Sequence, residues 1–326
     1  MKIIDEILIY IADNDIIIPI FETVGEQAMR YQKVTEIAAA WGISERSVRK
    51  YCAEGKIIGA VLDGKTWKIP ENAVKPARKK RAGKRNSDLL TRLRREKESA
   101  IPGGIYHKIQ IELTYNSNRM EGSRLSHDQT RYIFETNTIG VQDKTVNVDD
   151  VVETANHFRC IDLVIELANY RLSESLIKQL HGILKSGTSD SRKAWFAVGD
   201  YKRLENEVGG NPTAKPENVA KEIKQLLKKY NAEKNKTIYE IIEFHYEFEK
   251  IHPFQDGNGR VGRLIMFKEC LRNGITPFII EDDMKEYYYR GLKEWKTESG
   301  YLTDTCLAAQ DRFKEYMDYF GLKYSD

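Results

Sequence analysis

Residues able to carry out acid–base and metal chemistry lie together in the stretch HPFQDGNGRVGR, which runs from His252 to Arg263. The His252 imidazole can take up a proton near neutral pH, so it is a candidate general base. Asp256 offers carboxylate oxygens, which are the ligands that Mg²⁺ takes alongside phosphate groups. A base and a metal ligand so close in sequence predict a reaction at a phosphate.

The residues that follow are suited to binding an anion. Gly257 and Gly259 lack a Cβ atom, so their backbone N–H groups can approach an anion closely. Arg260 and Arg263 stand three apart on one face of the next predicted helix, and guanidinium groups match phosphate oxygens. A glycine-rich helix–helix turn with satisfied charges is the structural alternative. The full set of groups favours phosphoryl or nucleotidyl transfer instead.

Two predicted helices hold this loop. Apolar residues recur at spacings of three and four on both sides of it, which is the pattern of amphipathic helices. The first helix carries Ile241, Ile242, His245, Phe248 and Ile251, and the second carries Val261, Leu264, Ile265, Phe267 and Leu271. The second helix begins at the glycines, where its N-terminal N–H groups and dipole favour negative charge.

The stretch from His252 to Arg263 resembles the signature of the Fic family, with every expected position filled. The resemblance implies a helical bundle and an enzyme that uses ATP and Mg²⁺ to place AMP on a Ser, Thr or Tyr hydroxyl of a target protein. It implies a base (His252), a loop anchor (Phe254), a metal ligand (Asp256), an anion hole for the α- and β-phosphates (Gly257, Asn258 and Gly259), a β-phosphate contact (Arg260) and a γ-phosphate contact (Arg263). The intact Gly-Asn-Gly sequence favours AMP transfer over the phosphate transfer of Doc-type kinases.

Two further segments fit the same family. The run VGGNP is similar to the family's flap hairpin, which clamps a target segment by strand addition; its contact residues would be Val208, Gly209, Gly210 and Asn211. The run EYYYRGL resembles the helix that walls the base and ribose, with Tyr288 and Tyr289 as candidates. An ordinary loop and an aromatic core stripe are the respective alternatives.

The run SNRMEG, Ser117 to Gly122, looks like the family's inhibitory motif. The resemblance implies that Ser117, Glu121 and Gly122 form an inhibitory site, in which Glu121 pairs with Arg263 and occupies the space of the γ-phosphate. A capped helix with a surface glutamate is the alternative.

Residues 31–75 are predicted to form two short helices and a hairpin. Thr35 is the expected N-cap of the first helix, Ser44 caps a second over Glu45–Glu54, and Asp63-Gly64 is a hairpin turn signal. The pattern resembles MerR-like or excisionase-like helix-turn-helix modules with a β-hairpin wing. The outward basic residues of the second helix are the candidate contacts to duplex DNA: Arg46, Arg49 and Lys50. A protein-interaction module is the alternative.

The expected fold is mainly α: a Fic helical bundle with a small β-hairpin flap, preceded by a small winged helix-turn-helix domain. The expected domains are an unassigned extension (1–30), the helix-turn-helix module (31–75), a basic linker (76–88) and the Fic domain with its inhibitory helix (89–326). Lys75 to Arg85 carries seven basic residues and no acid, so it is either a solvated linker or a phosphate-contacting arm.

The composition indicates a cytoplasmic protein. Hydrophobic residues make up 41% and charged residues 31% of its 326 residues, as in globular proteins. The cysteines form no CxxC pair, the remaining histidines lack metal-ligand spacing, and no apolar run is long enough to span a membrane.

Three alternatives remain open from the sequence. The protein could be a DNA-binding regulator whose Fic domain senses nucleotide, or an enzyme that removes AMP with Glu121 positioning a water. It could also use another nucleotide, such as UTP. The target protein is not specified by the sequence, and the family resemblance allows a homodimer.

Overall fold

The structure is a computed structural model that describes residues 30–41, 43–53, 55–64, 66–75, 88–140 and 145–324. The described residues are mainly helical, as predicted, with 60% helix and few strands. The chain divides into two compact units, Met1–Gly83 and Lys84–Asp326. Most of the expected extension (1–29) and most of the expected basic linker (76–87) lie outside the described residues.

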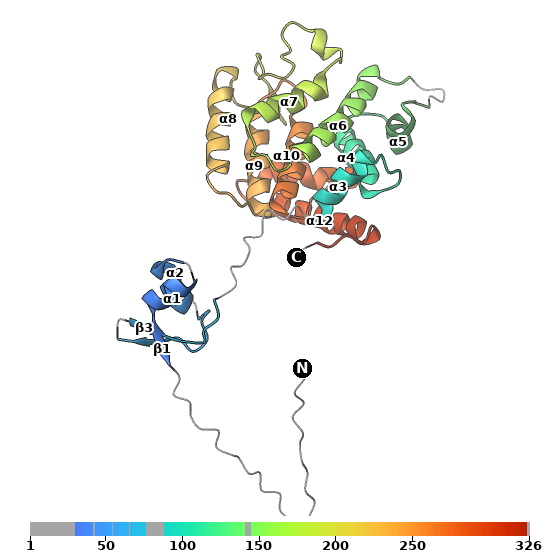
Figure 1. The fold of residues 1–326 in the computed structure, drawn as a ribbon. Helices are drawn as coiled ribbons and strands as arrows, with labels where there is room; N and C mark the ends of the chain where they lie inside the picture. Colours follow the sequence, from blue (N-terminus) through green and yellow to red (C-terminus); the bar gives the residue numbers. More distant parts are fainter. Residues whose placement is uncertain are drawn as a thin grey trace, which may run out of the picture. The chain divides into compact units, whose positions relative to one another are not determined.

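Within its described residues, the first unit contains two helices and a three-stranded antiparallel sheet of strand order β1-β3-β2 (Figure 1). Its elements are β1 (Tyr31–Lys33), α1 (Val34–Trp41), α2 (Glu45–Ala53), β2 (Val61–Asp63) and β3 (Thr66–Pro70). The predicted helices and the predicted hairpin are present. Strand β1 was not predicted, because it is only three residues long and pairs with β3 from far along the chain, with Tyr31 opposite Pro70.

The expected N-cap of α1 is wrong. Helix α1 begins at Val34, so Thr35 lies inside its first turn. The backbone N–H of Lys33 instead donates to Glu36 Oε2 at 2.9 Å. The shift buries Val34 with Ile37 in the small core of this unit, and this burial favours the earlier start.

The second unit is a bundle of helices with a small hairpin. Its helices are α3 (Asp88–Glu98), α4 (Ile105–Met120), α5 (His127–Thr136), α6 (Val148–Glu166), α7 (Glu174–Lys185), α8 (Pro216–Tyr230), α9 (Ile238–Ile251), α10 (Asn258–Asn273), α11 (Lys285–Glu294) and α12 (Gly300–Tyr319). Two short 3₁₀ turns, η1 (Asp190–Arg192) and η2 (Asp282–Met284), and the strands β4 (Glu207–Val208) and β5 (Asn211–Pro212) complete it.

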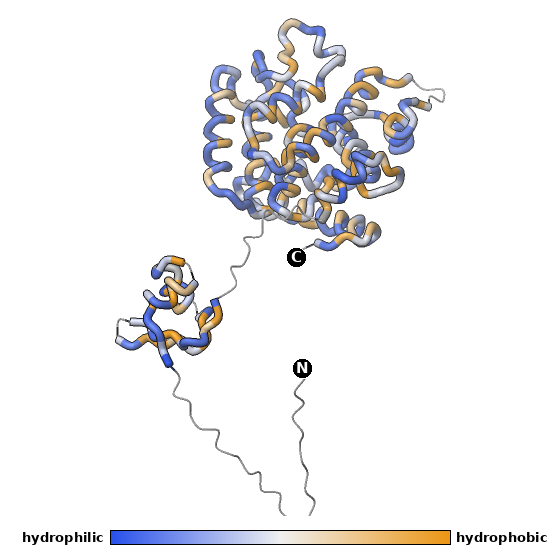
Figure 2. The backbone as a smooth tube through the Cα atoms, in the orientation of Figure 1, coloured by the Kyte–Doolittle hydropathy of each residue, from blue (hydrophilic) through white to orange (hydrophobic). Residues whose placement is uncertain are grey.

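Helix α10 lies at the centre of this bundle, in contact with α4, α6, α7 and α9 (Figure 1). Every residue from Asn258 to Leu271 is buried. Figure 2 shows both hydrophilic and hydrophobic positions along the helices of this unit. Because polar groups in α10 are buried with the apolar ones, they must find partners inside the protein.

The loop before α10 has firmly defined ends. Helix α9 begins with a capping box in which Thr237 and Glu240 exchange hydrogen bonds, and it ends at His252 in the left-handed conformation. Helix α10 begins after Gly257, whose φ of +82° is also left-handed. The short connection between these ends places the residues 252–257 against the N-terminus of a buried helix.

Candidate active site

His252 occupies an unusual backbone position. Its φ of +51° is uncommon for a residue with a Cβ atom, and such conformations cluster at functional sites. Burial, together with the charge of nearby Lys202, lowers the pKa of His252 to about 4. The imidazole is therefore neutral at pH 7 and able to accept a proton. It lies 3.9 Å, Nδ1 to Oε2, from Glu249, whose pKa burial raises to about 8.

Asn258 closes the loop with its side chain. Its Oδ1 accepts the Phe254 N–H at 2.8 Å, and its Nδ2 donates to the Phe254 carbonyl at 2.8 Å. The Phe254 ring stacks on His181 with centroids 4.0 Å apart, which anchors the loop in the core. Asn258 is the first residue of α10, so its backbone N–H has no acceptor within the helix and can be offered to an anion.

The carboxylate of Glu121 lies in the space where the sequence predicts an anion. Its Oε1 is 2.6 Å from Arg263 Nη2, as expected from the resemblance. Ser117 holds the same guanidinium, since its hydroxyl and carbonyl oxygens accept from Arg263 Nε and Nη2, each at 2.9 Å. A Cβ atom on Gly259 would stand 2.3 Å from Glu121 Oε1, so only glycine leaves room for this carboxylate. Gly122 has a φ of +96° at the turn after α4.

Burial opposes the charge of Arg263, but the neighbouring Glu121 carboxylate together with Tyr288 and Tyr289 outweighs burial and raises the pKa of Arg263 above its ordinary value. The Arg263 side chain is 3% exposed, whereas Glu121 is 24% exposed. The arginine is thus a fixed buried cation, and the glutamate is the partner that can leave.

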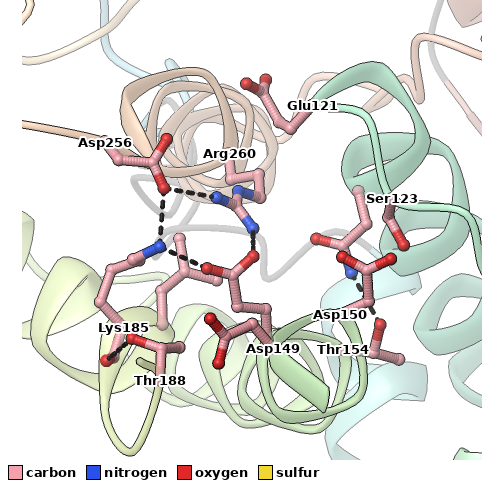
Figure 3. A network of polar contacts seen from close by, with 12 residues as sticks. Glu121, Ser123, Asp149, Asp150, Thr154, Lys185, Thr188, Asp256 and Arg260 are labelled. Carbon is pink, nitrogen blue, oxygen red and sulfur yellow. Dashed lines mark hydrogen bonds and ion pairs between the residues drawn. The ribbon is translucent and has the colours of Figure 1, made fainter. Parts of the chain in front are cut away.

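Asp256 and Arg260 belong to a closed set of four charged side chains, which we call the charge ring (Figure 3). Lys185 Nζ lies 2.7 Å and Arg260 Nη2 lies 3.2 Å from Asp256 Oδ2. Glu153 completes the ring by pairing with both cations, through Oε1 to Lys185 and through Oε2 to Arg260. Burial would raise the pKa of Asp256, but Arg260 and Lys185 outweigh burial and hold it well below the ordinary value.

Asp256 fits a magnesium ligand of the kind completed by phosphates. Its side chain is 45% exposed and ionised, and Mg²⁺ sites in phosphate chemistry need only one or two carboxylates. The described residues contain no group of three or more His, Cys, Asp or Glu arranged to hold a metal. A cation at Asp256 would therefore depend on phosphate oxygens and water for its other ligands.

The hairpin of β4 and β5 is tied to the loop that carries His252. Gly209 and Gly210 both have positive φ, and this forms the tight two-residue turn of a hairpin. Buried Lys202 donates to Asn206 Oδ1 and Thr213 Oγ1, each at 2.6 Å, just outside the two strands. Its backbone N–H donates to the Pro253 carbonyl at 2.9 Å, next to His252. The predicted contact residues Val208, Gly209, Gly210 and Asn211 are all exposed, as are Glu207 and Pro212.

The two candidate tyrosines differ in accessibility. Tyr288 is 1% exposed and its hydroxyl is 2.6 Å from His245 Nε2, so it belongs to the core and presents no surface to a nucleotide here. Tyr289 is 40% exposed, and its hydroxyl donates to the Met120 carbonyl at 3.1 Å. For Tyr288 the burial favours the alternative given above, an aromatic core stripe, because helix α11 turns that ring inward.

Sequence reasoning missed Glu153, Lys185, Lys202 and Glu249. The first three lie far in sequence from the signature and reach it only through packing. Glu249 lies just before the signature. Its place on the polar side of the amphipathic helix gave no signal, because only the packed bundle shows that this side is covered.

The candidate DNA-contacting residues of the first unit lie on helix α2. Arg49 and Lys50 are exposed, and Arg49 Nη2 pairs with Glu45 Oε2 at 2.6 Å. Exposed pairs of this kind contribute little free energy, so the guanidinium can exchange partners. The side chain of Arg46 and residue Gly42 lie outside the described part of the structure.

Residues 171–270 match the family model described as Fic/DOC family. "Protein adenylyltransferase Fic" from Drosophila grimshawi is 29% identical over 209 residues, which cover 62% of this chain and 39% of that protein. The chain thus spans well under half the length of the curated relatives it matches. None of the helices in the described ranges is long and apolar enough to cross a membrane.

Solved structures share the fold. A Fic domain-containing signalling protein from Bacteroides thetaiotaomicron has a TM-score of 0.53 and 25% identity, covering 71% of this chain and 90% of that one. Fic-1 from C. elegans has a TM-score of 0.55 and 19% identity, covering 71% of this chain and 69% of that one. The chain therefore contains a Fic/DOC family domain, matched over residues 171–270.

Proposed function

We propose that this protein is a Mg²⁺-dependent protein adenylyltransferase, which transfers AMP from ATP to a Ser, Thr or Tyr hydroxyl and is held inactive by Glu121. The observation that carries the proposal is the Glu121 carboxylate, which lies against Gly259 and Arg263 at the N-terminus of α10. A carboxylate in that position supports the binding of an anion at this helix N-terminus. The relatives named adenylyltransferases support ATP as the substrate.

In the proposed reaction the target hydroxyl oxygen attacks the α-phosphorus of ATP, and pyrophosphate leaves as the bond to the β-phosphate breaks. His252 takes the hydroxyl proton, because it is neutral at pH 7. The N-terminal N–H groups of α10, with Arg260 and Arg263, bind and orient the phosphate oxygens. Asp256 would hold Mg²⁺, which supplies neutralisation of phosphate charge when bound.

Other parts of the site have supporting roles in the proposal. The exposed hairpin residues Val208 to Asn211 would clamp the target segment by strand pairing. Tyr289 would wall the base and ribose. Ser117 and Gly122 would fix Glu121 at the end of α4, where its carboxylate competes with the γ-phosphate for Arg263.

The deciding experiment is incubation with ATP labelled at the α-phosphorus, followed by detection of label on protein. We expect strong labelling for Glu121→Gly and weak labelling for wild type. Glu121→Gln, which keeps the side-chain volume and removes the charge, should resemble the glycine variant. His252→Ala in the Glu121→Gly background is the matched negative control. An absence of protein-bound label in every variant would contradict the proposal.

A second candidate is a DNA-binding regulator whose Fic domain senses nucleotide. The exposed basic residues Arg49 and Lys50 on α2 favour it, and both activities can coexist in one chain. Removal of AMP by the same site, with Glu121 positioning a water, is the third candidate. We also propose a cytoplasmic location, an optional homodimer, and the domain boundaries 1–30, 31–75, 76–88 and 89–326.

A further inference from the structure

The charge ring contains two side chains that no step of the proposed mechanism uses. These are Glu153 on α6 and Lys185 at the end of α7. The side chains of Lys185 and Arg260 are 2% and 4% exposed, and Glu153 is 13% exposed. Buried charges are costly unless they are paired, so these three side chains are held where the structure shows them.

Asp256 is the one open member of the ring. It uses a single oxygen, Oδ2, for both cations. Its second oxygen points away from the ring in Figure 3. A cation that binds Asp256 must therefore compete with the positive charge of Lys185 and Arg260.

Glu153 weakens the competition of Lys185 and Arg260 with a cation at Asp256. It contacts both cations at once, through separate oxygens. Without that carboxylate, both cations would have Asp256 as their nearest ring partner. Asp190 also contacts Lys185, at 3.1 Å, but it is shared with Lys193 and does not touch Arg260.

We propose that Lys185 and Glu153 are positioning residues that set how strongly Asp256 takes a divalent cation, with opposite signs. The Lys185 ammonium competes with a divalent cation for the Asp256 carboxylate. Glu153 weakens this competition, because it pairs with Lys185 and Arg260 and reduces their attraction to Asp256. The inference deepens the proposed function and rests on it where ATP is the probe.

The test measures how strongly Mg²⁺ promotes ATP binding, by calorimetry with Mg²⁺ and with EDTA, in the Glu121→Gly background. AMP incorporation is measured over a range of Mg²⁺ concentrations in parallel. Glu153→Gln should raise the half-saturating Mg²⁺ concentration and Lys185→Met should lower it. Each shift should be about fivefold, because Asp256 is half-exposed and water screens much of one added or removed charge. The double variant should return to within about twofold of its parent.

Two controls separate this role from a structural one. Lys185→Arg keeps the charge and should resemble the parent. Lys268→Met removes another fully buried lysine, one that pairs with Glu269, and should lower the melting temperature without moving the Mg²⁺ dependence. Thermal unfolding of every variant shows which ones fold.

Shifts of the same sign for Glu153→Gln and Lys185→Met, or no shift in folded variants, would overturn the inference. If calorimetry shows opposite shifts in Mg²⁺ dependence but no variant transfers AMP, the roles of Glu153 and Lys185 are supported and the proposed activity is refuted. If the variants transfer AMP with the same Mg²⁺ dependence as their parent, the activity is supported and the roles of Glu153 and Lys185 are refuted.

Discussion

His252 is uncharged at neutral pH, so its ring is in the form that can accept a proton. Its pKa of about 4 results from burial first and from the charge of Lys202 second. Lowering the pH through 4 would protonate it and remove its function as an acceptor. At pH 7 it is already in the working form.

Replacing His252 should slow AMP transfer strongly and leave the affinity for ATP nearly unchanged. We expect His252→Ala, in the Glu121→Gly background, to lower the rate of AMP transfer by about 10²–10⁴-fold. ATP affinity should stay within about threefold, because the imidazole takes a proton from the target and binds no phosphate. Rates come from label incorporation and affinities from calorimetry. Near-normal transfer by a folded His252→Ala protein would assign the base to another group.

The contact between Glu121 and Arg263 predicts strong non-additivity. Glu121→Gly should increase self-modification, because it frees Arg263 for the γ-phosphate. Misplacing a reacting group by about 1 Å can cost about 10²-fold in rate, so a gain of that order is expected. Arg263→Ala should undo the gain, since the γ-phosphate then has no anchor.

The four proteins of this cycle are compared by intact mass after incubation with ATP. Wild type, Glu121→Gly, Arg263→Ala and the double variant are measured together. If wild type and Glu121→Gly incorporate AMP equally, Glu121 is not inhibitory. It would then be an ordinary helix-end residue or the water-positioning group of AMP removal.

At the scale of elements, the hairpin β4–β5 depends on Lys202. This lysine bonds to residues on both sides of the hairpin and to the backbone beside His252. Lys202→Met should loosen the hairpin and raise the target concentration needed for half-maximal transfer. It should also raise the pKa of His252, because Lys202 helps to lower it. The acid limb of the pH–rate profile would therefore move to higher pH.

Lys178→Met is the matched control, because Lys178 pairs with Glu174 and Asp200 and, among the described residues, makes no hydrogen bond or ion pair to the loop of His252. The profile of Lys202→Met is measured beside it in the Glu121→Gly background. An unmoved acid limb together with unchanged target dependence would show that the lysine only fills space.

At the scale of the whole molecule, buried histidines should make folding sensitive to acid. Burial lowers the pKa of His157, His181 and His245 to about 3, and that of His252 to about 4. These groups are neutral when folded and protonate on unfolding below pH 6.5, so they contribute stability above pH 6.5 that is lost as the pH falls. Glu249 acts in the opposite direction, because its raised pKa of about 8 favours the folded state below that pH.

Between pH 5 and 6 the four histidines outweigh the one glutamate, so unfolding should take up about three protons per molecule. The free energy of unfolding should then fall by about 4 kcal/mol for each pH unit of acidification. Urea unfolding at several pH values measures this slope. A slope near zero in this range would mean that the histidines are solvated and protonate in the folded protein.

We predict that the full chain binds duplex DNA through the first unit and that the affinity falls as the salt concentration rises. Arg49→Ala with Lys50→Ala should weaken binding and reduce the slope of log K against log salt by about 1.8 in magnitude. Lys228→Ala with Lys229→Ala removes the same charge from exposed positions on α8 and should have no such effect. Anisotropy titrations at several salt concentrations measure the slopes. An absence of binding at low salt would favour a protein-interaction module.

The sequence by itself determined the features that depend on neighbouring residues. The base, the metal ligand, the glycines and both arginines stand within one short stretch, so their chemistry was readable without the fold. The flanking helices α9 and α10 followed from apolar spacing, and the hairpin β2–β3 from its Asp-Gly turn. Glu121 was placed opposite Arg263 through family resemblance, since nothing in the spacing of two residues 142 positions apart indicates contact.

Only the tertiary structure decided which groups surround that stretch. Glu153 reaches Arg260 across 107 positions, and Lys185 reaches Asp256 across 71, because α6 and α7 pack on α10. The packing of α11 with its neighbours buries Tyr288, and burial keeps His252 neutral. Burial and long-range pairing depend on how whole helices meet, and local sequence patterns report only which face of a helix is apolar.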